Sequence, residues 1–382
     1  MSRFDDPSRG HVRCSASPLI AGDLRRRGWQ VREDVLEPEA HASAGDSWLF
    51  TATYLDRAGG AVGFGVAAHH RDTSALDAAA EAVVTWCSIL RTRRLLVADA
   101  DLSCAGARRA RQLISRPETA GREPRYVLGE SPALEELGPS ETKVVHSLDD
   151  VPPTGTVVFP PYGVAPRVRA EAAARGFEVI DATCPLVAAT HANLRRFAQD
   201  GDTVAVVGET GRAAETVLLE QVNGSAVAVK TPAEVNALQA EQGHLSYVVA
   251  NGADVGEAIR LASALRARHP RLRAQHPDGL CYATSDRAET ARSVSVACDT
   301  TLVLDPARTH EWAELVADGP RVHRIADSAD IQPAWLAHAG TVGLVAATPD
   351  QSLTEAVVEA LSGLGPLSVA RRSVTTEIDK GW

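Results

Sequence analysis

The sequence predicts an α/β protein: three related α/β units with parallel sheets, preceded by a small α+β domain. From residue 95 onward, apolar strand-like runs alternate with helical patterns, which is typical of parallel sheets. Within that region a pattern of strand, helix cap and acid recurs three times. Residues 1–94 instead place their predicted strands between two helices.

The bulk composition indicates a globular protein without a basic surface. The chain has 382 residues, enough for two to four domains, and a formal net charge of −10. An acidic chain is a poor candidate for binding nucleic acids or membrane surfaces. It has no apolar run long enough to span a membrane, and "MSRFDDPSRGH" is not a signal peptide. We therefore expect a cytoplasmic protein with reduced cysteines.

The N-terminal domain is predicted to have the order α-β-β-β-α. Its expected elements are a helix at 17–28, strands at 29–37, 47–56 and 61–70, a turn at 57–60, and a helix at 73–90. This order is similar to that of a double-stranded-RNA-binding domain, but the start of the last helix, "RDTSALDAAAEA", is not basic. We therefore interpret residues 1–94 as a docking or dimerisation module, through which two chains could form a homodimer.

The three α/β units are expected at 95–188, 189–280 and 281–382, the last with a C-terminal tail. The clearest strands are predicted at 94–99, 155–160, 177–182, 202–208, 245–251, 300–305 and 341–347. The recurring pattern is "VVHSLDDV", "AVKTPAEV" and "HRIADSADI". In each copy a cap is followed three residues later by an acid, as in a capping box. The pairs are Ser147 with Asp150, Thr231 with Glu234, and Asp327 with Asp330.

Three of the six cysteines share one sequence context. Cys104, Cys184 and Cys281 each stand just before a predicted helix, and their spacing resembles that of the caps. In parallel α/β units, ligands collect at the carboxyl ends of strands, beside helix N-termini. A helix N-terminus also favours a thiolate over a thiol. Cys87 and Cys298 lie within apolar helical patterns and are expected to fill the core.

Three converging thiolates predict a soft-metal site. Four cysteines usually hold a [4Fe–4S] cluster, so three would leave one iron open to a substrate. Two other interpretations remain open at this point. The cysteines could be structural, or one of them could be the nucleophile of a metal-free enzyme.

The sequences around these cysteines resemble those of the LytB (IspH) family of 4-hydroxy-3-methylbut-2-enyl diphosphate reductases. The resemblance covers residues 95–382 and includes "CAGA" at 104–107, "DATCPLV" at 181–187 and "CYAT" at 281–284. It implies a three-lobed fold around a [4Fe–4S] cluster held by Cys104, Cys184 and Cys281. It also implies two electrons from a ferredoxin or flavodoxin, and an allylic oxygen that binds the open iron and leaves as water.

The sequence departs from the family where the family binds its diphosphate. Tyr162 replaces a histidine, and "VLGESPALEEL" replaces a histidine-rich stretch. "GETGRAAET" places Arg212 and Ala214 at a His and at the Glu that donates a proton. "VANGA" replaces T-Q-T, and "PARTHEW" replaces the diphosphate loop. The candidate substrate-binding residues are therefore Arg212, Asn251, Arg308, Thr309 and His310.

A proton donor is needed in place of the lost Glu, and Tyr162 and His191 are the catalytic candidates. Tyr162 could instead simply pack, and His191 could support the cluster ligands. The arginines Arg212 and Arg308 suggest an anionic group, such as a carboxylate held by two hydrogen bonds.

The resulting hypothesis is an iron–sulfur enzyme with reductive or Lewis-acid chemistry on a non-standard substrate in specialised metabolism. A reductase for the family's own diphosphate fits less well. A non-catalytic redox sensor is the alternative from another class. In a sensor the fourth iron would be closed, for example by His191, Glu209 or an N-terminal residue.

Overall fold

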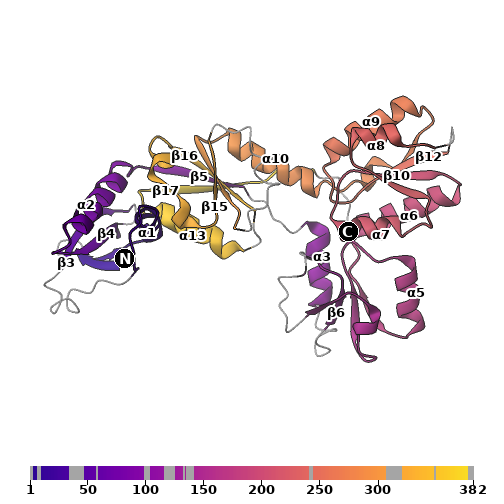
Figure 1. Ribbon diagram of the computed structural model, residues 1–382, viewed down its shortest axis with the longest axis horizontal. Helices are drawn as coiled ribbons and strands as arrows, with labels where there is room; N and C mark the ends of the chain where they lie inside the picture. The colour runs from indigo at the N-terminus through magenta and orange to yellow at the C-terminus, as the bar shows by residue number, and fades with distance from the viewer. Residues whose placement is uncertain are drawn as a thin grey trace. The chain divides into compact units, whose positions relative to one another are not determined.

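The computed structural model describes residues 3–6, 10–33, 47–56, 59–98, 104–115, 125–131, 134, 142–240, 244–306, 321–347 and 350–376. The chain divides into two compact units, one of residues 1–102 and 287–374 and one of residues 103–286 and 375–382. The described residues form three parallel sheets and one small mixed sheet (Figure 1). The predicted α/β class is therefore confirmed. None of the helices in the described ranges is long and apolar enough to cross a membrane.

The first parallel sheet has the strand order β7-β6-β8-β9. Its strands are β6 (Arg125–Leu128), β7 (Thr142–Val145), β8 (Thr156–Phe159) and β9 (Glu178–Asp181). Helices α3 (Ala105–Ile114) and α5 (Pro166–Ala174) cover it. Val157 of β8 packs in a cluster with Ala172 of α5, and its neighbour Val158 packs with Ile114 of α3. Since successive strand residues point to opposite faces, the two helices lie on opposite faces of the sheet.

The second parallel sheet has the order β11-β10-β12-β13. Its strands are β10 (Thr203–Val207), β11 (Ala226–Val229), β12 (Leu245–Val249) and β13 (Arg273–Ala274). Its helices are α6 (Pro185–Gln199), α7 (Arg212–Leu219), α8 (Pro232–Ala237) and α9 (Val255–Arg268). One apolar cluster joins these strands to residues of all four helices. Nearly every residue of β10 and β12 is buried, as expected for strands covered on both faces.

The third parallel sheet has the order β15-β14-β16-β5-β17. Its strands are β5 (Arg93–Ala98), β14 (Thr300–Leu304), β15 (Val322–Ile325), β16 (Thr341–Ala346) and β17 (Leu367–Arg372). Its helices are α10 (Ala283–Val296), α12 (Pro333–Leu336) and α13 (Gln351–Ser362). Leu95 of β5 packs in the cluster that contains Leu361 of α13, whereas Leu96 packs with Val294 of α10.

The threefold repeat predicted from the caps is present in the structure. Strands β7, β11 and β15 each form the outer edge of a parallel sheet, next to β6, β10 and β14. A capped turn follows each of them: η3 (Leu148–Asp150), α8 and η5 (Ser328–Asp330). Ser147 with Asp150 and Thr231 with Glu234 form complete capping boxes. In the third copy, Asp327 caps the Ala329 N–H and Asp330 accepts from the Ala326 N–H.

One strand lies in a different sheet from the one predicted. Strand β5 was expected to open the unit at 95–188, but it pairs in parallel with β16 and β17. In the third sheet β5 is the fourth strand, next to β16. The same position is held by β9, next to β8, in the first sheet and by β13, next to β12, in the second. The chain therefore leaves the third sheet before it builds the first. The three predicted domain boundaries otherwise stay a prediction.

The N-terminal sheet has the order β1-β2-β4-β3, so the predicted order α-β-β-β-α was wrong. Its elements are β1 (Arg3–Asp6), β2 (Gly10–Arg13), α1 (Ser17–Arg26), β3 (Ser47–Leu55), β4 (Ala61–His69) and α2 (Thr73–Ser88). Two strands precede the first helix. The strand predicted at 29–37 does not form over 29–33, and its remainder lies outside the described residues. In that segment the Arg25 side chain donates to the Val31 carbonyl at 3.2 Å.

Arg93, the first residue of β5, is a buried cation held by backbone carbonyls. Its side chain is 2% exposed and donates to the carbonyls of Leu364 and Leu336, at 3.2 and 3.3 Å, and to that of Ile89. Burial, with a smaller contribution from Arg91, lowers the pKa of the guanidinium to about 10, so it is charged at neutral pH. One side chain thus ties β5 to the last residue of α12 and to the segments after α2 and α13.

We expect Arg93→Ala to lower the free energy of unfolding by about 3–5 kcal/mol, because it removes three hydrogen bonds from a charged donor and leaves a cavity in the core. The control is Arg94→Ala, since the Arg94 side chain is exposed. That change should cost no more than about 0.5 kcal/mol. Denaturant unfolding of both variants checks the prediction, and equal losses would contradict it.

Candidate functional site

Cys184 lies in a turn between the end of β9 and the start of α6. It is the N-cap of α6, and Pro185 occupies the first helical turn, where a missing N–H costs nothing. Its own N–H donates to the Pro161 carbonyl at 2.9 Å, which ties this turn to the one after β8. Burial raises the pKa of its thiol, and the backbone N–H groups of Val187 and Leu186, in the first turn of α6, lower that pKa by less. A helix N-terminus thus faces the Cys184 sulfur and favours its anionic form.

Asp181 braces the turn that carries Cys184. One carboxylate oxygen accepts from the Thr183 N–H at 3.1 Å and from its hydroxyl at 2.5 Å, and the other pairs with Arg169 at 2.6 Å. Partial burial raises the pKa of Asp181, but the hydrogen bonds from Arg169 and Thr183 outweigh it and hold the pKa below its usual range. The carboxylate therefore stays charged at neutral pH and fixes Thr183, the residue before the cysteine.

Cys104 lies close to Cys184 because Gly106 leaves room for sulfur. Cys104 is the N-cap of α3, and Gly106 lies in the first turn of that helix. A Cβ atom built on Gly106 would lie 2.6 Å from the Cys184 sulfur and 3.7 Å from the Cys104 sulfur. Real Cβ atoms do not approach that closely, so any side chain at 106 would displace Cys184.

Cys281 completes the group of three thiols. Burial, the largest cause, holds the pKa of the Cys184 thiol above its usual value; the N–H groups of Val187 and Leu186 lower the pKa by less, and the charges of Cys104 and Cys281 raise it further. The three sulfurs are therefore near enough to interact electrostatically. None of the six cysteines forms a disulfide.

The residues after Cys281 hold a neighbouring loop. The Thr284 hydroxyl donates to the Gly252 carbonyl at 2.7 Å, and the Ser285 hydroxyl accepts from the Val255 N–H at 2.8 Å. Both contacts reach the turn between β12 and α9. The "CYAT" segment is thus fixed at the carboxyl end of the second sheet.

These donors fit an iron–sulfur cluster better than a single ion. In the ranges that the structure describes, no three His, Cys, Asp or Glu side chains are grouped closely enough to hold one metal ion. A four-iron cluster places metal and sulfide between its thiolates, so its ligands stand farther apart. The all-sulfur donor set suits such a group.

Tyr162 lies in the turn after β8, next to the residue that accepts from Cys184. Its hydroxyl donates to the Leu128 carbonyl at 3.3 Å. Burial and the nearby charge of Glu130 raise the pKa of Tyr162, so it keeps its proton at neutral pH. The hydroxyl occupies the space that a side chain at Gly129 would fill. Gly129 has φ +83°, which also favours glycine.

His191 lies on α6 and is buried, with 5% of its surface exposed. Its Nε2 atom has no hydrogen-bond partner among the described residues. Burial, followed by the charges of Arg195 and Arg169, lowers the pKa of His191 to about 4, so the imidazole is neutral at pH 7. Its Cε1 atom would lie 2.8 Å from a Cβ built on Gly163. His191 therefore packs directly against the Tyr162 turn.

The other predicted binding residues are distributed unevenly. Arg212 is exposed at the first residue of α7, and among the described residues its guanidinium has no hydrogen-bond or ion-pair partner. Asn251 follows β12; its carbonyl accepts from the Thr210 hydroxyl at 2.8 Å, and its buried Oδ1 atom has no partner in the described ranges. Arg308, Thr309 and His310 lie outside the described residues. Cys87 and Cys298 pack in the core as expected.

Two positions that shape the candidate site escaped the sequence analysis. Gly106 and Gly129 matter because they lack a side chain. The reason is visible only in the structure, where the Cys184 sulfur lies against Gly106 and the Tyr162 hydroxyl against Gly129. The one available signal was position: each glycine falls within or beside a segment already singled out, "CAGA" and "VLGESPALEEL".

Comparison with known proteins identifies the relatives of this chain. A family model described as LytB protein matches residues 95–362. "4-Hydroxy-3-methylbut-2-enyl diphosphate reductase 2" of Mycobacterium bovis is 35% identical over 297 residues, which cover 74% of this chain and 90% of the relative. The reductase of Bordetella pertussis is 33% identical over 276 residues, covering 70% and 85%.

Solved structures show the same fold at lower identity. The E-1-hydroxy-2-methyl-but-2-enyl-4-diphosphate reductase of Plasmodium falciparum superimposes with a TM-score of 0.63 at 18% identity, covering 76% of this chain and 95% of that chain. A second reductase structure, of the terminal enzyme of the non-mevalonate pathway, gives 0.54 at 21% identity, covering 71% and 99%.

We expect Gly106→Ala to lower the iron bound per chain severalfold after anaerobic reconstitution, because the new methyl group displaces the Cys184 sulfur. Overpacking of this kind also costs about 1–3 kcal/mol of stability. Gly211→Ala is the control, since a Cβ there meets nothing within 4 Å. Iron and sulfide analysis of both variants checks the prediction. A full complement of iron in Gly106→Ala would show that this spacing is not needed.

Proposed function

This chain belongs to the family of LytB proteins and is an iron–sulfur oxidoreductase, and from that premise we propose that it reductively removes a hydroxyl group from a substrate other than the diphosphate of its relatives. The observation that carries the proposal is a three-thiol group in a chain that has Arg212 and Ala214 where the family pattern has a His and the proton-donating Glu. The reaction consumes two electrons and two protons and releases the hydroxyl oxygen as water. The electrons would come from a small carrier such as a ferredoxin or flavodoxin.

We assign the [4Fe–4S] cluster to Cys104, Cys184 and Cys281. When bound, the cluster supplies electrons and an iron that can accept a substrate oxygen. The protein's part is to hold the thiols at the spacing that a cluster needs, and binding of the cluster would favour their thiolate forms. The missing side chain at Gly106 leaves the Cys184 sulfur its place close to Cys104.

The altered pocket argues for an anion smaller than a diphosphate. A diphosphate needs several cationic or N–H donors, since each buried anionic oxygen without a donor costs about 1–3 kcal/mol. Arg212 is available, with no partner among the described residues. The acid that the family uses is Ala214 in this chain. A single guanidinium suits a carboxylate, which it can hold through two parallel hydrogen bonds. We therefore propose a carboxylate-bearing substrate.

Tyr162 is our choice for the residue that holds a proton at the site. It is protonated at neutral pH and lies in the turn that is bonded to Cys184. His191 is neutral and buried, so it cannot deliver a proton from an imidazolium ion at pH 7. Its contact with Gly163 suits a positioning role beneath the Tyr162 turn.

A second candidate function is reduction of 4-hydroxy-3-methylbut-2-enyl diphosphate itself. The names of the relatives favour it, at up to 35% identity over most of the chain. A non-catalytic redox role is the third possibility, and it predicts no turnover of either substrate.

A pair of probes separates these functions. The diphosphate and 4-hydroxy-3-methylbut-2-enoate share an allylic alcohol but differ in their anionic group. We expect dithionite-reduced, iron-loaded protein to reduce the carboxylate and to leave the diphosphate largely unchanged. Iron content should be lost when Cys104, Cys184 or Cys281 is replaced by Ser. Robust turnover of the diphosphate would overturn our proposal in favour of the second function.

Arg212→Gln tests the anion contact directly. It should raise KM for the carboxylate about ten- to hundredfold, the value of one charged hydrogen-bonded pair. Arg266→Gln, a change of an exposed arginine on α9, is the control and should change nothing. Equal kinetics for the two variants would remove Arg212 from the site.

We also propose that two copies of the chain pair through β3. Among the described strands, β3 pairs only with β4, so one edge of this nine-residue strand is open. "SWLFTATYL" carries no charge and exposes Trp48, Leu49 and Leu55. Long, uncharged edge strands pair readily with another strand, and antiparallel pairing with the same strand satisfies twofold symmetry.

Trp48→Lys should convert the dimer to a monomer, because a charge on an edge strand blocks strand pairing. Val84→Lys is the matched control: Val84 is exposed to a similar extent, 67% against 62%, but lies on α2. Sedimentation velocity of the three proteins gives the result. A monomeric wild type, or a dimeric Trp48→Lys, would refute the pairing.

A further inference from the structure

Gln221 is a buried amide to which the proposed reaction gives no part. It lies just beyond the end of α7 and is 6% exposed. Its Nε2 atom donates to the carbonyls of Val164 and Val217, both at 3.1 Å, and its Oε1 atom accepts from the Arg195 guanidinium at 2.5 Å. One side chain thus joins α7, α6 and the turn after β8.

These three elements carry residues of the candidate site. Arg212 begins α7, Cys184 precedes α6, and Tyr162 lies in the turn after β8. The three hydrogen bonds of the amide end on other residues of the same elements. Gln221 therefore acts on the site by holding those elements in place.

The backbone of Tyr162 is anchored on both sides. On one side the Cys184 N–H donates to the carbonyl of Pro161, the residue before Tyr162, at 2.9 Å. On the other side Gln221 donates to the carbonyl of Val164, which follows Tyr162 in the same turn. Each anchor fixes a different side, so the loss of one would free that side of Tyr162 while the other remains.

Arg195 determines which way the amide points. A guanidinium has only donors, so the Gln221 oxygen faces it and the nitrogen faces the Val164 carbonyl. A glutamate at this position would satisfy Arg195 but would have no N–H for Val164. The contacts therefore require an amide, and another polar side chain would not serve.

A second contact between the same elements is weaker. Glu220, the neighbour of Gln221, pairs with Arg167 of α5 at 2.9 Å, but their side chains are 37% and 74% exposed. Exposed ion pairs contribute little, whereas a buried carbonyl that loses its donor costs much more. The bond from Gln221 to Val164 is buried, so we expect it to dominate.

We propose that Gln221 is a positioning residue that fixes Tyr162 beside the Cys184 turn. The inference rests on the proposed function, in which Tyr162 holds a proton at the site. Gln221 keeps the backbone that follows Tyr162 in place. The Tyr162 hydroxyl then stays on the Leu128 carbonyl, to which it donates at 3.3 Å.

The test reads the position of Tyr162 without any substrate. The full-length protein, purified anaerobically, is labelled with 3-fluorotyrosine at its five tyrosines and examined by fluorine NMR. Tyr162→Phe removes one signal and so assigns it. Tyr54, which lies in the other compact unit, is the internal reference.

In Gln221→Glu and Gln221→Met, the Tyr162 signal should move or broaden by more than its line width, because Val164 loses its donor. The glutamate keeps a partner for Arg195 and the methionine keeps the length of the side chain, so neither opens a large gap. Glu220→Gln is the matched control. It removes the exposed ion pair between the same elements and should leave the signal in place.

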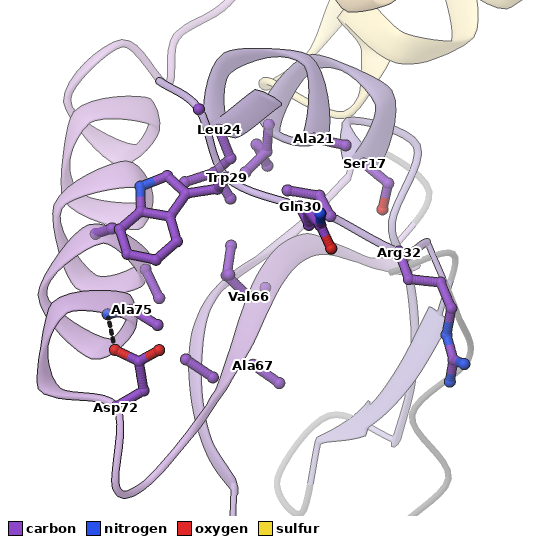
Figure 2. Close-up of a pocket in the computed structure, with 17 residues that line it drawn as sticks. Ser17, Ala21, Leu24, Trp29, Gln30, Arg32, Val66, Ala67, Asp72 and Ala75 are labelled. Atoms are coloured by element: carbon purple, nitrogen blue, oxygen red, sulfur yellow. Dashed lines mark hydrogen bonds between the residues drawn. The ribbon is translucent and has the colours of Figure 1, made fainter. Parts of the chain in front are cut away.

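A second control separates a general loss of stability from this local effect. Asp72 caps α2 in the other compact unit, where its carboxylate accepts from the Ala75 N–H at 2.9 Å (Figure 2). Asp72→Ala removes that cap and should lower the melting temperature without changing the Tyr162 signal. Melting temperatures of all variants are measured alongside the spectra.

Turnover supplies an independent readout. With 4-hydroxy-3-methylbut-2-enoate, Gln221→Glu should lower kcat about ten- to hundredfold, because a small misplacement of Tyr162 slows proton transfer. KM should change by less than about twofold, since Arg212 is the residue that contacts the anion. Arg212→Gln is expected to raise KM instead, so the two variants differ in kind.

The outcomes distinguish this inference from the proposed function. An unchanged Tyr162 signal in both Gln221 variants would overturn the inference, whatever the turnover. A shifted signal with the expected fall in kcat supports it. A shifted signal with wild-type kcat supports the positioning of Tyr162 and refutes the proton role given to Tyr162 above. A wild type without turnover refutes the proposed reaction, and the NMR comparison still decides the role of Gln221.

Discussion

Room for sulfur at the start of α3 is the constraint on which the candidate site depends. Cys184 can face Cys104 only because position 106 has no side chain. The parallel sheets supply the rest of the arrangement. They bring strand ends and helix starts to the same edge, so backbone N–H groups meet the Cys184 sulfur. The bond from the Cys184 N–H to Pro161 then brings the Tyr162 turn to the same place.

Much of the fold could be predicted because its signals are local. The capping pairs at Ser147 and Thr231 depend only on residues three apart, and they correctly marked the edge strands before them. The sheet membership of β5 was not predictable in this way. Its apolar sequence shows that it is a buried strand, but nothing within it names β16 as its neighbour. The strand prediction for 29–33 was wrong for a related reason. The alternation of residues there suits a strand, but the Val31 carbonyl accepts a hydrogen bond from the Arg25 side chain.

The residues of the candidate site likewise fall into two groups: those with a local sequence signal and those that only tertiary contacts reveal. The three cysteines stand out by their spacing and their place before helices, and Cys104 and Cys281 lie near enough to Cys184 for their charges to raise the pKa of its thiol. Their role as cluster ligands stays a prediction. Gly129 and Tyr162 form a pair that sequence alone does not join, since the Tyr162 hydroxyl fills the space that a larger residue at 129 would take. The neutrality of His191 likewise follows from burial, which depends on the tertiary packing around α6.

The position of β5 has a consequence for how the chain is made. The second sheet uses residues 203–274 and can form as soon as that stretch leaves the ribosome. Strand β5 is made early, but its neighbours β16 and β17 lie near the end of the chain. At ribosomal rates it waits on the order of tens of seconds with its apolar residues unpaired. During that interval β5 is a natural target for chaperones, and a ribosome that stops early releases a chain with this strand exposed.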